Sequence, residues 1–228
     1  MSTSQQRQRQ AAEMGLHGSP LRRISWASKA MVTLLRDPED TEQVFLLSLM
    51  LNRRVMPAFL RRFAAHPGGA RLLAETPSID SSQIDYAALA ELPATTLGGA
   101  YARFLEHNQL DADFFQAPPG LPDDIAYLVK RMRQSHDLWH VVTGYTTSVA
   151  DEIALQAFVY AQTRMPSPLM IAAFGTARFL LADRAARLGA WRGYRRGREA
   201  HWLVPVRWEE LWESPLHDVR TKLGISAC

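Results

Sequence analysis

Apolar residues recur every three or four positions along most of the chain, the spacing that places them on one face of an α-helix. The pattern predicts helices over residues 21–35, 39–51, 57–66, 70–75, 86–91 and 97–107. Segments that contain proline or glycine, at 37–38, 67–69 and 76–78, separate these helices, because neither residue suits a helix interior. Only residues 202–206 have the composition of a short strand. Since nothing repeats and no long linker divides the chain, we expect a single all-α domain over residues 21–228.

The second half contains two helical segments joined by a polar turn. Pro122 followed by two aspartates indicates a helix start, and Gly144 indicates its end. The next helix begins at Asp151 or Glu152, and a proline-containing segment at 164–168 precedes a long helix that we expect over 169–188. The stripe predicted to face the core in the first of these helices consists of Ile125, Leu128, Val129, Met132, His136, Trp139, His140 and Thr143.

Two histidines on this stripe have the spacing of metal ligands. His136 and His140 are four positions apart, so their imidazoles project from one side of the helix about one turn apart. Asp137 lies on the neighbouring flank, where it can coordinate or hold a histidine ring. If the chain reverses after Gly144, Glu152 opens the next helix and can point back at the histidines. The sequence therefore predicts a divalent-metal site between two adjacent helices.

Other interpretations of the same residues remain open. A single histidine on an apolar stripe is more often a hydrogen-bonded core residue, and only the pair with an intervening aspartate favours a metal. Glu152 has the ordinary alternative of an acid in a first helical turn, which the helix dipole favours. Asp151 has one too, as the partner of Ser148 in a capping-box-like spacing.

Composition narrows the class of protein. A chain of 228 residues, 47% apolar and 21% charged, suits a globular protein with one core. No apolar run approaches the ~20 residues that a membrane-spanning helix needs. The only cysteine, Cys228, allows neither an intrachain disulfide nor a thiolate metal cluster. The net charge of +3 is too small to indicate nucleic acid, and we expect no such partner. Residues 1–20, rich in Gln and Arg, predict a flexible arm rather than a secretory signal, with a transit peptide as the alternative.

The segment from Gln134 to Tyr145, followed by Glu152, is similar to a known signature. It resembles the H-D-x-x-H-(eleven residues)-E motif of the Coq-four family of coenzyme Q (ubiquinone) biosynthesis proteins. Residues 92–101, 194–198 and 208–212 resemble further blocks of that family, and the resemblance covers residues 21–225. One departure is Asp151, where the family pattern has glycine before the glutamate; it bears on the tightness of the turn or adds a carboxylate near the metal.

The resemblance implies an all-α protein with a catalytic metal bound by His136, Asp137, His140 and Glu152, and a polyprenyl lipid in an apolar groove. Zinc is the metal that we expect first, with iron, manganese, cobalt and magnesium as alternatives. The implied activity is oxidative decarboxylation of a polyprenyl-hydroxybenzoate, in which a hydroxyl replaces the C1 carboxylate. The alternative is a non-catalytic scaffold that presents prenylated precursors to the other ubiquinone-biosynthesis enzymes.

The resemblance also implies a location and partners. We expect peripheral association with the cytoplasmic side of a bacterial inner membrane, or with the matrix side of the mitochondrial inner membrane in a eukaryote. The partners are the prenylated aromatic substrate and other proteins of the pathway, and a homodimer stays open. The helix starts at Val44 and Leu169 are candidates for the prenyl groove, and the headgroup candidates are Arg192, Arg195, Arg196 and Arg198. The alternatives are an ordinary core for the apolar stretches and a solvated face for the arginines.

Two other metal-enzyme classes fit the residues less well. A zinc peptidase uses H-E-x-x-H, in which the glutamate between the ligands is the general base. Asp137 is one methylene shorter and would reach a metal-bound water poorly. An HD-type phosphohydrolase needs further His and Asp ligands from distant helices, and the sequence offers no matching set.

Overall fold

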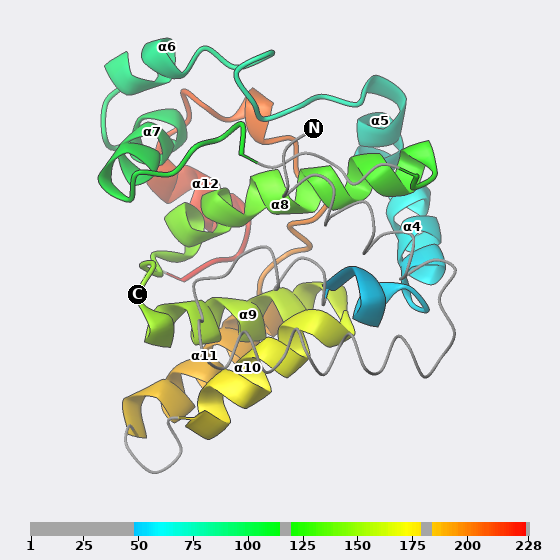
Figure 1. Ribbon diagram of the computed structural model, residues 1–228. Coiled ribbons are helices and arrows are strands. Elements are labelled where there is room, and N and C mark those ends of the chain that lie inside the picture. Colours follow the sequence, from blue (N-terminus) through cyan, green and yellow to red (C-terminus); the bar gives the residue numbers. More distant parts are fainter. Residues whose placement is uncertain (1–47, 115–119, 179–183, 227–228) are drawn as a thin grey trace.

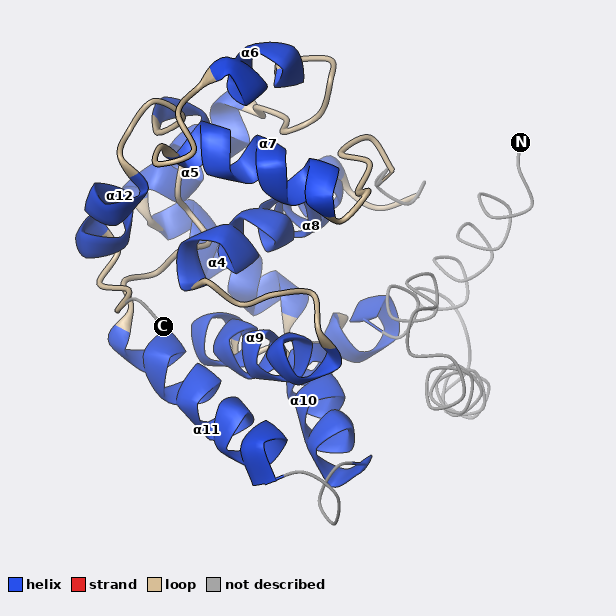
Figure 2. Cartoon of the chain, turned by 90° about the vertical axis from the view of Figure 1, so that its left-hand side faces the viewer, coloured by secondary structure: helices blue, strands red, loops and turns tan. Residues whose placement is uncertain are grey.

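The computed structural model describes residues 48–114, 120–178 and 184–226, and within these ranges the fold is all helical (Figures 1 and 2). The prediction of an all-α protein is therefore confirmed. Residues 48–52 are helical, while the remainder of the helices expected at 21–35 and 39–51, and the arm at 1–20, lie outside the described residues. The helices are α4 (Met56–Ala65), α5 (Pro67–Glu75), α6 (Tyr86–Glu91), α7 (Leu97–His107), α8 (Asp123–Thr143), α9 (Val149–Thr163), α10 (Pro166–Arg178), α11 (Arg184–Glu199) and α12 (Leu216–Lys222), with a 3₁₀ turn, η1 (Trp208–Glu210).

Helix α8 runs through the middle of the molecule (Figure 1). It packs against α4, α5, α7 and α12, and Leu128, Leu138 and Val142 on it are fully buried. Its ends are those that the sequence predicts, because Pro122 precedes the first turn and Gly144 follows the last. The predicted inward stripe of α8 is confirmed, since all of its members are buried or half-buried.

Helices α9, α10 and α11 form a second group beside α8 (Figure 2). The prediction of one long helix over residues 169–188 is wrong. α10 ends at Arg178 and α11 begins at Arg184, so the chain returns along α9. The physical reason is close packing by small residues. A Cβ on Gly193 would lie 2.0 Å from the carbonyl oxygen of Ala154 in α9, so the two helices touch through their backbones.

Two local expectations are also corrected. The proline and glycines at 67–69 do not break the chain but begin α5, because proline fits the first turn of a helix, where its missing N–H is not needed. The strand considered at 202–206 does not form. There the backbone N–H of Leu203 donates to the side-chain oxygen of Gln162 at 2.8 Å, and Leu203 and Val204 are buried as an irregular core segment.

Candidate metal centre

The turn between α8 and α9 is fixed by its own hydrogen bonds. Gly144 has φ 78°, a left-handed conformation that suits glycine, and its N–H donates to the carbonyl of His140 at 2.8 Å. Ser148 begins α9 and accepts from the N–H of Asp151 at 3.3 Å. The Asp151 carboxylate in turn accepts from the backbone N–H of Thr146 at 2.9 Å. Asp151 is therefore a turn residue that holds the reversal of the chain, and its carboxylate does not join the metal candidates.

This reversal brings Glu152 to the two histidines. Its carboxylate lies 3.0 Å from Nε2 of His140 and 3.7 Å from Nε2 of His136. One ligand atom from each of the three side chains lies within 4.8 Å of the other two. The imidazole rings are 4.9 Å apart and nearly perpendicular, at 89°. Two nitrogens and a carboxylate that converge in this way match the ligand set of a zinc, iron or manganese site with open positions.

His140 is held in the orientation that a ligand requires. Its Nδ1–H donates to the carbonyl oxygen of Tyr145 at 3.1 Å, which leaves Nε2 directed at Glu152. The ring of Phe104 stacks on the imidazole, with centroids 5.4 Å apart, and the side chain is 1% exposed. A backbone partner on the far ring nitrogen is the arrangement that fixes the tautomer of metal-bound histidines.

The charges of the cluster depend on one another. Burial opposes the charging of His140, but the hydrogen bond and negative charge of Glu152, together with the Tyr145 carbonyl and Asp137, outweigh burial and raise the pKa of the imidazole. Burial likewise disfavours the carboxylate of Glu152, yet the two histidines hold its pKa well below the usual range. The ionised carboxylate thus lies where the Nε2–H of a protonated His140 can donate to it. A divalent cation can replace that proton and satisfy the same three groups.

Asp137 is placed beside the cluster rather than in it. It lies on the adjacent flank of α8, half-buried, and is not one of the three side chains whose ligand atoms converge. Burial raises the pKa of its carboxyl group, and the nearby His136 and His140 oppose that rise. Among the described contacts, none joins Asp137 to a histidine ring by a hydrogen bond. Its influence on the site is therefore electrostatic in this structure.

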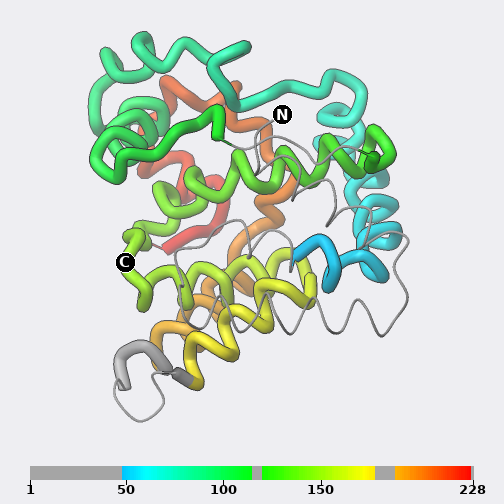
Figure 3. The backbone as a smooth tube through the Cα atoms, viewed as in Figure 1, coloured from blue at the N-terminus to red at the C-terminus, as the bar shows by residue number. Residues whose placement is uncertain are grey.

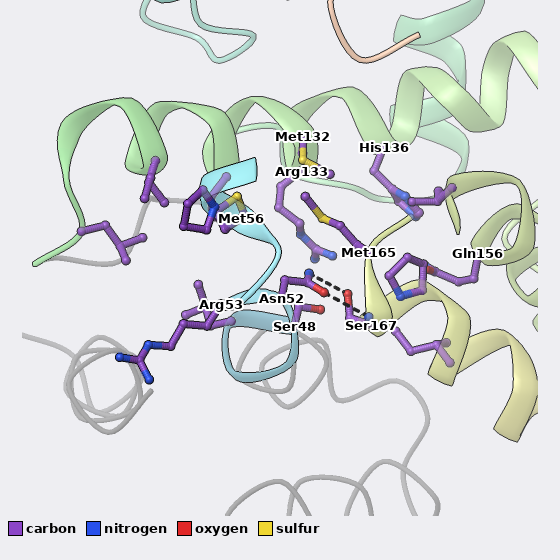
Figure 4. A pocket seen from close by; sticks show the side chains of 18 of the residues that line it. Ser48, Asn52, Arg53, Met56, Met132, Arg133, His136, Gln156, Met165 and Ser167 are labelled. Carbon is purple, nitrogen blue, oxygen red and sulfur yellow. Dashed lines mark hydrogen bonds between the residues drawn. The ribbon is translucent and has the colours of Figure 1, made fainter. Parts of the chain in front are cut away.

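A cavity of about 310 Å³ opens beside the cluster and has His136 in its wall (Figure 4). α4, α8, α9 and α10 contribute to the lining, together with residues 48–53. Polar lining is sparse: Ser48, Asn52, Arg53, Arg133, His136, Gln156 and Ser167 stand among apolar side chains. The apolar wall includes Met56, Leu121, Ile125, Val129, Met132, Val159, Met165 and Ile171. A concave, mostly apolar site with a few polar groups has the character of a small-molecule site.

The lipid-contact candidates are only partly brought to this cavity. Val44 lies outside the described residues. Leu169 is 43% exposed and borders a shallow surface groove between α9, α10 and α11, whereas Ile171 of the same helix reaches the cavity. Arg192, Arg195 and Arg198 are exposed on α11, as a headgroup role requires.

The contacts of Arg196 differ from those expected of a headgroup-binding residue. Its guanidinium donates to the carbonyls of Thr143 and Ser226, at 2.7 Å each, and lies 4.8 Å from the centroid of the Tyr145 ring. It therefore ties α11 to the end of α8 and to the C-terminal segment, which removes it from the headgroup candidates. The pattern of arginines along the sequence does not distinguish this inward position from its exposed neighbours.

The comparison with known proteins agrees with this architecture. The sequence model described as "Coenzyme Q (ubiquinone) biosynthesis protein Coq4" matches residues 15–228. The chain belongs to the Coq4 family. A "Ubiquinone biosynthesis protein COQ4 homolog, mitochondrial" of Drosophila ananassae is 33% identical over 211 residues, which cover 91% of this chain and 79% of that protein. The human protein of the same name is 31% identical over 214 residues, covering 92% and 80%.

A solved structure gives the same result for this Coq4 chain. The crystal structure of a protein assigned to ubiquinone biosynthesis, from Nostoc punctiforme, superimposes with a TM-score of 0.72. It is 29% identical in sequence and the match covers 94% of this chain and 98% of that one. The chain therefore has a role in ubiquinone biosynthesis. In the part of the chain that the structure describes, no helix is both long and apolar enough to cross a membrane.

Two of the Coq4-like blocks pack against each other behind the site. The N–H of Gly98 donates to the carbonyl of Trp212 at 2.8 Å, and the ring of Tyr101 stacks on the Trp212 indole at 5.8 Å. The buried guanidinium of Arg131 on α8 forms a salt bridge with Glu209 of the second block. Sequence reasoning missed Arg131, and also Arg133 in the cavity. The available signal was that these two arginines flank Met132, a member of the predicted inward stripe.

Proposed function

We propose that this Coq4 protein is a metal-dependent enzyme that carries out oxidative C1 decarboxylation of a polyprenyl-hydroxybenzoate. The observation that supports the proposal is the opening of the His136–His140–Glu152 cluster into an apolar cavity through His136. A metal site without an adjoining cavity would favour a structural ion. An apolar cavity without the cluster would favour a simple lipid carrier. The combination favours chemistry on the polar head of a lipid.

The reaction replaces a carbon–carbon bond at C1 by a carbon–oxygen bond. The ring is electron-rich at C1 when the para phenol is ionised, so C1 can react with oxygen and then lose CO₂. With O₂ as the oxidant, two electrons and two protons from a reductant are needed to give the hydroquinone, CO₂ and one water. His136, His140 and Glu152 would hold the metal, which supplies Lewis acidity toward the carboxylate or the phenolate. Asp137 would add negative charge beside the two histidines.

The test is the release of labelled CO₂. Purified protein is loaded with Zn²⁺, Fe²⁺, Mn²⁺ or Co²⁺ and incubated with carboxyl-labelled 3-geranyl-4-hydroxybenzoate, O₂ and a two-electron reductant. We expect CO₂ from the wild type with at least one metal and none from His140→Ala, which should remain folded by circular dichroism. Tight binding of the lipid without CO₂ release under any metal would instead support the scaffold role. Full turnover by a metal-free His140→Ala variant would contradict the proposed site.

A second element of the proposal is peripheral attachment to the membrane that carries the precursors. Trp191 is 62% exposed on α11, and Phe174 on α10 and Leu188 on α11 are each 42% exposed. Arg192 and Arg195 are exposed on the same helix as Trp191. Exposed aromatic and aliphatic side chains mixed with arginines suit the boundary between anionic headgroups and acyl chains. The proteins that would meet this one on that surface are other components of ubiquinone biosynthesis.

A further inference from the structure

Arg133 places a cation inside the apolar cavity. It lies on α8 three residues before His136, so the two side chains are neighbours on one face of the helix. Both line the cavity, and Figure 4 shows the Arg133 side chain extending from α8 into it. Arg53 also contributes to the lining, but its guanidinium points away from the cavity (Figure 4). Of the arginines in the described lining, Arg133 is thus the one directed into the cavity.

The wall opposite Arg133 is polar and fixed. The amide nitrogen of Asn52 donates to the hydroxyl of Ser167 at 2.9 Å, and the N–H of Ser167 donates back to the amide oxygen of Asn52 at 3.1 Å. Both residues are buried, with 6% and 4% exposure. This reciprocal pair joins the residues before α4 to the start of α10 and does not depend on a ligand for its hydrogen bonds. The cavity therefore has a cation and a polar patch held by its own hydrogen bonds, within a lining that is mostly apolar.

A desolvated guanidinium is costly unless an anion lies close to it. The negative charges that act on Arg133 are Asp137 and Glu152, of which Glu152 belongs to the cluster. A cation bound at the cluster would take up the charge of Glu152 and leave more of the field of Arg133 for a ligand. The planar fork of a guanidinium matches a carboxylate with two parallel hydrogen bonds.

We propose that Arg133 binds the carboxylate of the prenylated hydroxybenzoate and so selects the acid over its decarboxylated product. This inference rests on the proposed function and names the residue that recognises the substrate head. Because His136 is adjacent on α8, a carboxylate on Arg133 lies next to the metal cluster, where C1 must react. Loss of CO₂ removes the group that Arg133 holds, so the product binds less tightly and leaves.

The test compares two probes that differ only in the carboxylate, 3-geranyl-4-hydroxybenzoate and 2-geranylphenol. Their binding to the full-length, zinc-loaded protein is measured by isothermal titration calorimetry in detergent. We expect the wild type to prefer the acid by about 10- to 100-fold, the range of a charge-assisted hydrogen-bonded pair. Arg133→Met should bind both probes with similar affinity, and Arg133→Lys should keep part of the preference. The zinc content of both variants should equal that of the wild type.

Arg61→Met is the matched control, since Arg61 is exposed on α4 and outside the cavity lining, and it should keep the full preference. A wild type that binds both probes equally overturns the role of Arg133 and leaves the proposed function standing. A wild type that binds neither probe overturns the proposed function and this assignment with it. If Arg133→Met does not fold, the test rests on Arg133→Lys: a preference for the acid that is smaller than in the wild type supports the proposal, and an unchanged preference overturns it.

Discussion

His140 joins the backbone of the α8–α9 turn to the proposed metal site. One nitrogen of its ring donates to Tyr145 in the turn and the other faces Glu152, so the position of the ring follows from the position of the turn. Glu152 lies just after the same turn, at the start of α9, and Asp151 holds that turn by accepting hydrogen bonds from Thr146. The two neighbouring carboxylates thus have different roles: that of Asp151 stabilises the turn, and that of Glu152 is available to bind a metal ion.

This difference predicts opposite outcomes for two neighbouring isosteric changes. Glu152→Gln removes the anionic ligand and should weaken zinc binding by on the order of 100-fold or more, beyond the loss typical of groups that only orient ligands. Asp151→Asn keeps an oxygen that can accept from Thr146, so zinc affinity should change little. Competition with a chromogenic chelator measures both. Equal losses in the two variants would contradict the assignment of Glu152 as the ligand.

Asp80 carries a second residue-scale prediction, which concerns acid stability. Its carboxylate is nearly buried and lies 2.7 Å from the ammonium group of Lys130 on α8. Burial disfavours the charge, but Lys130 and the hydroxyls of Ser78 and Ser82 outweigh it and hold the pKa of Asp80 well below its usual range. A lowered folded-state pKa means that the stabilisation is complete above the unfolded pKa of about 4 and is lost as the pH falls below it.

Asp80→Asn should therefore cost about 3 kcal/mol at pH 7, because it leaves Lys130 without its partner in a poorly hydrated place. The same variant should lose less stability than the wild type between about pH 4 and pH 2. Urea unfolding followed by circular dichroism at several pH values measures both effects. Asp218→Asn, at a side chain that is 70% exposed, is the control and should match the wild type. Parallel pH profiles of wild type and Asp80→Asn would exclude this role.

At the scale of elements, the packing of α11 on α9 depends on glycine. A Cβ at Gly193 would lie 2.0 Å from the Ala154 carbonyl oxygen, whereas a Cβ at Gly189 would meet no atom closer than 3.8 Å. Both glycines are on α11, so the two sites differ in their contact with α9 rather than in helix propensity.

Gly193→Ala should destabilise the protein by about 1–3 kcal/mol, because α11 must move away from α9. Gly189→Ala should be neutral or stabilising by up to about 1 kcal/mol, because alanine favours the helix and finds room. Chemical denaturation of the two variants measures the difference. If both changes stabilise the protein, the close contact between the helices is not present in solution.

The elements that sequence reasoning located are those with local signals at both ends. α8 has Pro122 before it and Gly144 after it, and its helical period is uninterrupted between them. The division into α10 and α11 has no such local signal, because it depends on the packing of the glycine face of α11 against α9, a long-range contact. The reciprocal hydrogen bonds of Asn52 and Ser167 are of the same kind, because 115 positions separate the two residues. The metal cluster was predictable because its three side chains are close in the sequence: α8 carries the two histidines, and Glu152 lies in the first turn of the next helix, α9.

At the scale of the whole molecule, the α10–α11 pair presents the exposed face that we propose for the membrane. Neutralising Arg192 and Arg195 together should reduce flotation with vesicles of one-third phosphatidylglycerol, by roughly 30-fold in the partition coefficient for two charges at about 1 kcal/mol each. Raising the salt concentration should reduce it further. Neutralising Arg54 and Arg61, which are exposed near and on α4, removes the same charge elsewhere and should leave flotation unchanged. Equal flotation of all three proteins would rule out this face.

The volume of the cavity limits how much of a bound molecule it can enclose. Its volume of about 310 Å³ lies at the lower end of the range of small-molecule sites. α8 and α9 meet at their turn and diverge away from it (Figure 3), and the cavity is lined by both helices. For the proposed prenylated substrate, we predict that a site of this volume encloses the aromatic head with the first part of its tail, while the isoprene units beyond lie outside it. Binding affinity would then depend on the chemistry of the ring and change little with the length of the prenyl chain.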